Sequence, residues 1–371
     1  MAAASRPSKA RENKIAVARK LRVAVAGAGA FGRNHLRVYR ALEEEGLPVR
    51  LTAVVEPDLV RAGAAATDWG APVFSSVEEC LAARDEGQVV FAAASVCTPT
   101  SIHFPVAEAL LAADVDLLIE KPIATSVAEA NRLIELAAGH KCILQAGHLE
   151  RFNPAVIATE PILNHPMFFE AHRLSVFSPR ALDVDVILDL MVHDLDIVLS
   201  MVQSPVRSLQ AVGLPILSRK VDIANVRIEF ESGCVANFTA SRVSTEKVRK
   251  LRFFQPHQYV SIDYARRDLL LIDVSRAAHA EPAAIAAQAF TGAPGFPGLR
   301  IEKPEVRPGE PLRLEIESFL ECVRTRSAPR VSGEEGRAAL ALALDINAAI
   351  VAHAERAGLD CLMHPPAAPR P

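Results

Sequence analysis

The chain has 371 residues, of which 50% are hydrophobic and 23% are charged, and its formal net charge is -3. This balance is typical of a globular protein with two or three domains, and it offers no basic field for nucleic acid. No uninterrupted apolar run approaches the roughly 20 residues of a membrane span. The best candidate, 338–352, is interrupted by Asp345 and Asn347. We therefore expect no nucleic-acid partner and no membrane partner.

The six cysteines form no CxxC pair, and no histidine stands beside them at zinc-site spacing. They predict mostly buried thiols in a reducing compartment, so we expect a cytoplasmic protein without a metal site. Residues 1–20 lack the apolar segment of a secretory signal and are expected to form a disordered tail. An organellar transit peptide is the alternative there, and residues 357–371 are expected to form a second tail.

A glycine-rich turn lies between the first predicted strand (21–26) and the first predicted helix (33–45). It reads G-A-G-A-F-G, which places Gly27, Gly29 and Gly32 at the spacing of a dinucleotide-binding turn. The first glycine allows the tight bend, the second lets the backbone approach a pyrophosphate, and the third lets helix and strand pack closely. The helix N-terminus then offers N–H groups to the phosphates.

An acidic residue after the next predicted strand (51–55) indicates which dinucleotide is bound. Glu56 lies 24 positions after Gly32. A carboxylate near this spacing accepts hydrogen bonds from the adenosine ribose and repels a 2′-phosphate. The sequence therefore predicts NAD rather than NADP, with Phe31 of the turn among the contacting residues.

Strands and helices continue to alternate up to residue 147. The further predicted strands are 73–74, 89–96, 117–119 and 142–145, and the further helices cover 76–83, 103–111 and 126–138. This alternation predicts a doubly wound parallel sheet, so we expect an α/β Rossmann domain over 21–147.

Lys121 follows the apolar strand 117–119, where an open parallel sheet places its ligands. It is a candidate acid–base group, because partial burial lowers the pKa of an ammonium. The alternative is a solvated lysine without a chemical role. A second Glu-Lys-Pro, at 302–304, lies in a proline-rich stretch with no predicted strand before it, and we assign it no chemistry.

After Gly147 the pattern changes to a series of strands. They are predicted at 167–176, 206–217, 223–231, 234–243, 250–254, 259–264 and 269–274. Their alternating side chains and a Ser232-Gly233 turn predict a large, mostly antiparallel sheet with one packed face. We expect an α+β domain over 148–356, which ends in helices at 314–325 and 333–354 and contains an Ala/Pro/Gly-rich excursion at 277–311.

Two polar stretches of this second domain carry candidate site residues. Asp189, His193 and Asp196 can share one face of a helix, and a histidine held by a carboxylate is a good proton-transfer group. Arg151 and Asn153 follow the last strand of the first domain, where they could bind phosphate or sugar hydroxyls. The alternatives are an acidic surface cluster around a structural histidine, and a helix cap with an interdomain salt bridge.

Together these motifs resemble the Gfo/Idh/MocA family of sugar and cyclitol oxidoreductases, over residues 21–351. The resemblance rests on the glycine turn, on T-P-x-x-x-H, on Glu-Lys-Pro and on D-x-x-x-H-D-x-D. It implies that Lys121 and His193 flank the reacting carbinol, with Lys121 preferred as the base and His193 orienting the hydroxyl or replacing it. It also implies that Asp189 tunes His193 or binds a neighbouring hydroxyl, and that the peptide before Pro122 is cis.

The resemblance implies further binding residues. Those expected around the cofactor are Thr98, Pro99, His103, Glu120, Lys121 and Pro122, and those expected around the substrate are Lys121, His148, Arg151, Asn153, Asp189 and His193. The stretch 147–154, G-H-x-E-R-F-N-P, resembles the branch that oxidises UDP-N-acetylglucosamine at C3. Relatives that oxidise a UDP-sugar uronate or other sugars share many of these residues.

The implied function is NAD-dependent oxidation of a UDP-sugar. A pyridoxal-phosphate (PLP) aminotransferase would then convert the 3-keto product to a 3-amino sugar for lipopolysaccharide lipid A. A homodimer or homotetramer, formed through the antiparallel sheet, is also expected. The alternatives are oxidation of a free sugar or cyclitol by the same residues, and a catalytically silent NAD-sensing or scaffold protein.

Overall fold

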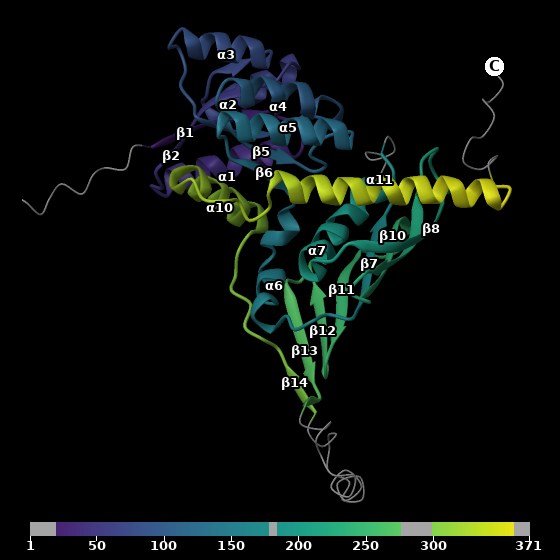
Figure 1. Ribbon diagram of the computed structural model, residues 1–371. Helices are drawn as coiled ribbons and strands as arrows, with labels where there is room; N and C mark the ends of the chain where they lie inside the picture. Colours follow the sequence, from purple (N-terminus) through teal and green to yellow (C-terminus); the bar gives the residue numbers. More distant parts are fainter. Residues whose placement is uncertain (1–19, 178–183, 276–298, 360–371) are drawn as a thin grey trace, which may run out of the picture. The chain divides into compact units, whose positions relative to one another are not determined.

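The structure is a computed structural model that describes residues 20–177, 184–275 and 299–359 (Figure 1). Most of both expected tails, and residues 277–298 of the expected excursion, lie outside the described residues. The chain divides into two compact units, Met1–Cys97 and Thr98–Pro371. Six parallel strands are ordered β3-β2-β1-β4-β5-β6, which confirms the predicted doubly wound sheet.

In the described residues of the first unit, 20–97, four strands alternate with three helices. Its elements are β1 (Leu21–Ala26), α1 (Gly32–Glu44), β2 (Val49–Val55), α2 (Leu59–Trp69), β3 (Val73–Phe74), α3 (Val77–Asp85) and β4 (Ala93–Val96). Ser76 caps α3 by accepting a hydrogen bond from the N–H of Glu79 at 3.2 Å. Helix α2, which the sequence patterns did not predict, is capped by Asp58 and buries only Ala65.

The second unit contains the remaining parallel strands and a separate sheet. Its first elements are α4 (His103–Ala112), β5 (Asp116–Glu120), α5 (Val127–His140), β6 (Leu144–Gly147), α6 (Pro154–Ile157), a π-helix (Ile187–Met191) and α7 (Val192–Val202). The long C-terminal helix α11 (Gly333–Arg356) packs against α5 and β6 and also against α7 and β8. By length and composition alone, α11 could cross a membrane, but here it packs against these elements.

The second sheet is mostly antiparallel, as predicted. Its strands are β7 (Phe168–Val176), β8 (Val206–Leu214), β9 (Ile223–Phe230), β10 (Val235–Ser244), β11 (Val248–Gln255), β12 (Gln258–Asp263), β13 (Asp268–Asp273) and β14 (Arg300–Glu302). Their order is β14-β13-β12-β11-β7-β10-β9-β8, and β7–β10 is the one parallel pair among the described strands of this sheet. The hairpin between β9 and β10 turns at Gly233, which has φ +84°.

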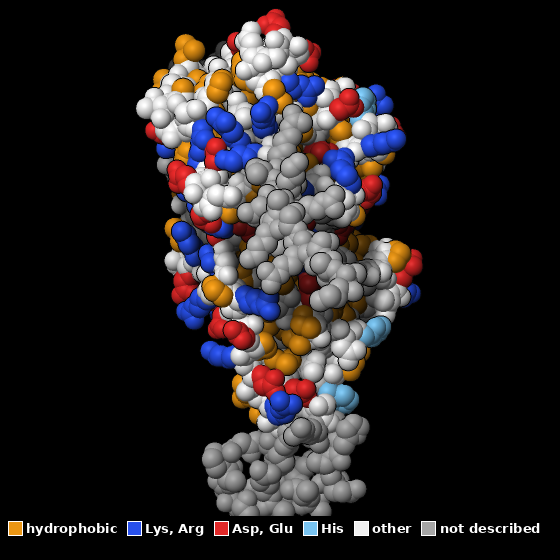
Figure 2. Space-filling view, turned by 90° about the vertical axis from the view of Figure 1, so that its left-hand side faces the viewer, with side chains coloured by type: hydrophobic (Ala, Val, Ile, Leu, Met, Phe, Trp, Pro, Cys, Tyr) orange, Lys and Arg blue, Asp and Glu red, His pale blue; other side chains and the backbone are white. Residues whose placement is uncertain are grey.

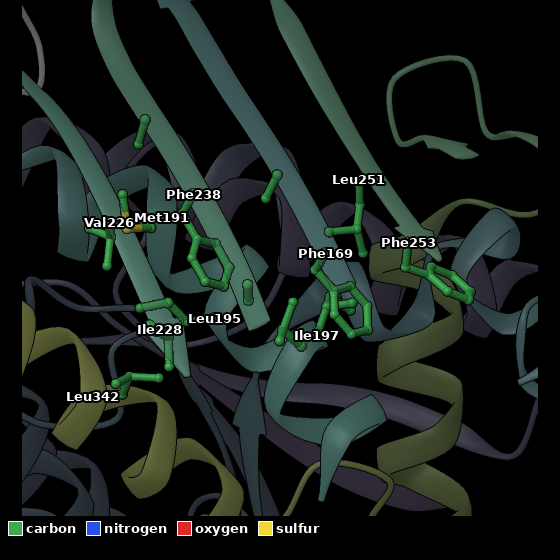
Figure 3. Close-up of a cluster of buried hydrophobic side chains, with 14 of the residues drawn as sticks. Phe169, Met191, Leu195, Ile197, Val226, Ile228, Phe238, Leu251, Phe253 and Leu342 are labelled. Atoms are coloured by element: carbon green, nitrogen blue, oxygen red, sulfur yellow. The ribbon is translucent and has the colours of Figure 1, made fainter. Parts of the chain in front are cut away.

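One face of this sheet packs on α7 and α11 (Figure 3). Phe169, Phe238 and Phe253 extend from β7, β10 and β11, and their neighbours include Leu195 of α7. The rings of Phe169 and Phe253 lie 5.4 Å apart. Burial of each such side chain contributes about 1.5–3 kcal/mol. This core fixes α7, which carries His193 at its N-terminal end.

The structure corrects the expectation that no strand precedes the second Glu-Lys-Pro. Residues Arg300–Glu302 form β14, which pairs antiparallel with β13 at the edge of the second sheet. Three residues are too few to show strand periodicity in a proline-rich stretch. Lys303, which follows β14, is 72% exposed and lies 3.7 Å from Asp268. It is a solvated lysine in a surface ion pair.

Candidate functional site

The glycine-rich turn of the first unit has the geometry of a dinucleotide cradle. A Cβ on Gly32 would lie 1.9 Å from the carbonyl oxygen of Gly27, so the close approach of α1 to the turn requires glycine there. Gly29, in contrast, has no atom within 4 Å of where its Cβ would be, which leaves its backbone open to a ligand. Phe31, beside the turn, is 37% exposed.

Glu56 closes the other side of the turn. Its carboxylate accepts hydrogen bonds from the N–H of Ala28 at 2.8 Å, from the N–H of Asp58 at 3.0 Å and from Arg61 at 3.0 Å. Burial opposes ionisation, but the hydrogen bonds from Arg61 and from the two N–H groups bring the pKa of Glu56 below its ordinary value. Glu56 is therefore a carboxylate that is hydrogen-bonded directly to the backbone of the glycine-rich turn.

A pocket of about 250 Å³ lies beside the same turn. Its lining includes Ala28, Gly29, Arg33, Arg61 and Trp69. Exposed backbone, the N-terminus of α1 and two guanidinium groups suit the phosphates and adenosine of a dinucleotide. The two arginines were missed from the sequence, although Arg61 stands only five positions after Glu56.

Lys121 lies in the second unit, where the peptide before Pro122 is cis, as expected. Its Nζ donates a hydrogen bond to the backbone oxygen of Asp189 at 2.8 Å and lies 3.6 Å from the carboxylate of the same residue. Burial lowers the pKa of Lys121, against the opposing effect of the Asp189 and Glu120 carboxylates. The 19% exposed side chain remains within reach of a ligand.

His193 is the second residue of α7 and follows directly on the π-helix that contains Asp189. Burial, with the positive charge of Lys121 next in importance, lowers the pKa of His193 well below its ordinary value. The ring is therefore neutral at pH 7, and its Nδ1 has no partner among the described residues. The expected α-helical spacing of Asp189 and His193 is replaced by a π-turn, and the Asp189 carboxylate instead faces Lys121.

His103 connects two of the expected cofactor residues. Its Nδ1 lies 2.9 Å from the backbone oxygen of Pro122, and its Nε2 lies 2.8 Å from that of Thr98. Burial lowers the pKa of His103, while these two carbonyl contacts oppose that shift. The side chain is only 1% exposed, so it holds the Thr98-Pro99 turn against the backbone that carries Lys121.

A buried ionic network supports the site and was missed from the sequence. Arg173 on β7 donates two hydrogen bonds to Asp194 of α7, at 2.8 and 3.0 Å, and one to Glu150 at 3.1 Å. Burial opposes its charge, but the two carboxylates raise the pKa of Arg173. The guanidinium also lies over the ring of Tyr264, 4.9 Å from its centre. Asp194 follows His193 directly, so the network holds the start of α7 on the sheet.

The stretch 145–154 holds three of the expected substrate residues, and two of them are almost fully buried. Asn153 caps α6 and donates to Glu150 and to the backbone of Tyr264, which is the cap expected as the alternative. Arg151 binds Asp196 at 3.4 Å and Glu335 at 3.0 Å. His148 is 1% exposed.

Sequence comparison places these features in a known family. Residues 21–148 match the oxidoreductase family with an NAD-binding Rossmann fold, and residues 165–255 match the Gfo/Idh/MocA C-terminal domain. The chain is 34% identical to a UDP-N-acetylglucosamine 3-dehydrogenase of Acidithiobacillus ferrooxidans, over 91% of this chain and 99% of that protein. It is also 34% identical to an inositol 2-dehydrogenase of Corynebacterium glutamicum, over 37% of this chain and 39% of the relative.

Solved structures agree with this assignment. The Acidithiobacillus enzyme superposes with a TM-score of 0.79, covering 90% of this chain and 98% of that one. The WlbA dehydrogenase of Bordetella pertussis, solved with NADH and UDP-GlcNAcA, has a TM-score of 0.70 at 18% identity, with 90% and 98% coverage, and so shares the fold. The chain belongs to the Gfo/Idh/MocA family of NAD-binding oxidoreductases.

Proposed function

We propose that this oxidoreductase oxidises the C3 hydroxyl of UDP-N-acetylglucosamine to the 3-keto sugar nucleotide. The observation that carries the proposal is the extent of the similarity to the Acidithiobacillus enzyme, which spans 99% of that protein. The similarity to the Corynebacterium inositol 2-dehydrogenase spans only 39% of that relative. A shared substrate domain favours the nucleotide sugar over a free cyclitol.

The chemistry requires a base for the hydroxyl proton, and bound NAD would supply the hydride acceptor. Lys121 fits the base, because its lowered pKa makes a neutral amine accessible and its Nζ is already oriented by Asp189. His193, held neutral, can donate or accept one hydrogen bond at the substrate hydroxyl. Asp189 is 32% exposed and can bind a neighbouring hydroxyl as well as Lys121.

The substrate is tested by following absorbance of the reduced cofactor with purified protein and NAD. UDP-N-acetylglucosamine should support turnover, and free UDP should inhibit it, because UDP would occupy the nucleotide subsite. Inositol and free N-acetylglucosamine serve as the comparison. Turnover of inositol without inhibition by UDP would instead identify a cyclitol dehydrogenase, and no turnover on any UDP-sugar would overturn the substrate proposal.

The role of Lys121 is tested by Lys121→Ala, with Lys303→Ala as a control from the same tripeptide sequence. Loss of a general base should lower kcat by about 100-fold to 10,000-fold. Binding of NADH, measured by the change in its fluorescence, should remain. Lys303 is a solvated surface lysine, so its variant should keep normal turnover. A Lys121→Ala enzyme with near-normal kcat would remove Lys121 from the chemistry.

The product of this reaction would be a 3-keto nucleotide sugar, which is suited to transamination. We propose a PLP-dependent aminotransferase as the functional partner and a cytoplasmic, lipopolysaccharide-related pathway as the setting. Adding such an aminotransferase with glutamate should pull the unfavourable oxidation forward and increase the yield of NADH. An unchanged yield would contradict this coupling.

A further inference from the structure

A second pocket of the first unit lies at the other end of β1 from the glycine-rich turn. The turn follows Ala26, the last residue of β1, whereas this pocket is lined by Arg22, the second residue of the same strand. Its volume is about 350 Å³, and every residue that lines it belongs to the first unit. Because β1 separates the two, the dinucleotide cradle does not account for this pocket.

Three arginines from three different elements line the pocket. They are Arg22 of β1, Arg50 of β2 and Arg40 of α1. Among the described residues, no Asp or Glu belongs to the lining, which also includes the apolar residues Leu51 and Val89. Guanidinium groups that gather in a hollow without carboxylates favour the binding of an anion.

Two of these arginines occupy directly paired positions in the parallel sheet. The register of β1 and β2 places Arg22 opposite Arg50. Paired residues of neighbouring strands, which lie about 4.7–4.9 Å apart, project from the same face, and like charges there destabilise a sheet. The pairing is unfavourable for the fold alone, whereas an anion between the two guanidinium groups would make it favourable.

The carboxylate beside the pocket compensates only part of this positive charge. Glu43 of α1 binds Arg40 at 2.7 Å, and its other oxygen lies 3.9 Å from Nε of Arg50. For the exposed Arg22 guanidinium, the described residues provide no hydrogen bond and no ion pair. One carboxylate among three guanidinium groups leaves two positive charges, which is close to the charge that a phosphate monoester brings at pH 7.

One of the three guanidinium groups is held in place before any ligand binds. Arg40 donates through Nη1 to Glu43 and through Nη2 to the backbone oxygen of Trp69, and its side chain is 22% exposed. A guanidinium has five N–H donors, so Arg40 keeps donors for a ligand. The Arg50 side chain is 62% exposed, so a ligand can reach it from solvent.

We propose that Arg22, Arg40 and Arg50 form a binding site for the phosphate group of a small phosphorylated molecule, separate from the dinucleotide cradle. The planar guanidinium fork binds two phosphate oxygens at once. A volume of about 350 Å³ is in the range of small-molecule pockets, and Leu51 and Val89 offer apolar surface to the organic part of a phosphate monoester. A monocarboxylate would leave one of the two positive charges without a partner. The site does not depend on which sugar the enzyme oxidises.

The site is tested by isothermal titration calorimetry of the full-length protein with inorganic phosphate and with glycerol 3-phosphate. NADH is kept saturating, so that the dinucleotide cradle is filled. Both probes should bind, and glycerol, which lacks the phosphate, should not. Arg22→Gln and Arg50→Gln should each weaken binding about tenfold to a hundredfold, because each removes a hydrogen bond between charged groups. Arg132→Gln removes an exposed, ion-paired arginine of α5 and should bind like the wild type.

Thermal unfolding distinguishes a binding site from a structural role of the arginines. In phosphate-free buffer, Arg22→Gln should melt no lower than the wild type, because the substitution removes the repulsion between paired arginines. Added phosphate should raise the Tm of the wild type and of Arg132→Gln more than that of Arg22→Gln. The proposal is overturned if the wild type binds neither probe or if all the variants bind alike. A lower Tm of Arg22→Gln in phosphate-free buffer would also overturn it, because the arginine pair would then stabilise the fold by itself.

Discussion

Lys121 is subject to two opposing effects, and their balance decides whether it can act as a base. Burial lowers its pKa, and the Asp189 and Glu120 carboxylates raise it. The net shift is downward, so the neutral amine is present at a lower pH than for a free lysine, whose pKa is about 10.4. Asp189 therefore orients Lys121 through its backbone oxygen, while its carboxylate limits how far burial lowers the pKa of Lys121.

Asp189→Asn should move the acidic limb of the pH profile of kcat/KM to lower pH. The base must be unprotonated, so activity rises as pH increases through the pKa of Lys121. Removing the carboxylate removes a contribution that raises that pKa, while the backbone hydrogen bond at 2.8 Å is kept. A limb that stays in place, or that moves to higher pH, would show that Lys121 does not govern it.

At the residue scale, the sequence predicted the side chains that belong to local motifs. Glu56 and Lys121 each follow a recognisable strand, and their positions can be read from the chain alone. The Arg173 network could not be predicted, because Glu150 and Asp194 are 23 and 21 positions away from Arg173. The burial of His148 also depends on distant segments, so it could not be predicted from the sequence. His148 was for that reason expected among the residues around the substrate.

At the scale of elements, α11 holds the second unit together by packing against β6 and α5 near its N-terminal end and against β8 toward its C-terminal end, with α7 also in contact. It starts with a capping box between Ser332 and Glu335. The packing on β6 is close, because a Cβ on Gly336 would lie 2.5 Å from the Cβ of Ala146. This contact lies one residue before Gly147, so α11 also positions the C-terminal end of β6.

Gly336→Ala should destabilise the protein by about 1–3 kcal/mol, because the added methyl overpacks the contact with β6. Gly139→Ala in α5 is the control, since nothing lies within 4 Å of the added methyl. That variant should be stabilised by about 0.5 kcal/mol, because alanine loses less backbone entropy on folding. Chemical denaturation measures both. Equal effects of the two substitutions would contradict close packing at Gly336.

Helices and strands whose hydrophobic residues recur at a regular spacing could be predicted from the sequence, whereas elements with irregular backbone geometry could not. The strands of the second sheet alternate buried and exposed residues, so their pattern is visible in the chain. The π-helix Ile187–Met191 has the sequence pattern of an α-helix, because the hydrogen bonds of the two helices differ in span by one residue and their compositions do not differ. Only the structure therefore shows that the Asp189 carboxylate faces Lys121.

At the scale of the whole molecule, the second sheet has one face packed on helices and one face that the described helices leave open. The open face bears the polar alternates of β9 and β10, such as Asn225, Arg227 and Thr239, around a hollow of about 530 Å³. On the face of the molecule that Figure 2 shows, Lys and Arg side chains are interspersed with Asp and Glu. The open face combines polar groups with charges of both signs, Glu170 and Arg227 among them, so a second copy of the same face can pair with it.

We predict that the protein forms a homodimer or homotetramer through this open sheet face. In a twofold-symmetric interface the same patch meets itself, so one added charge near the axis is repeated opposite itself and repels its copy. Thr239, which accepts a hydrogen bond from Asn225 at 3.0 Å, lies within the hollow. Thr239→Lys should therefore shift the mass measured by light scattering from oligomer toward monomer. Thr67→Lys makes the same chemical change at an exposed position of α2, outside this hollow, and should leave the mass unchanged. A wild type that is monomeric at micromolar concentration, or a Thr239→Lys variant that remains fully oligomeric, would exclude this face as the interface.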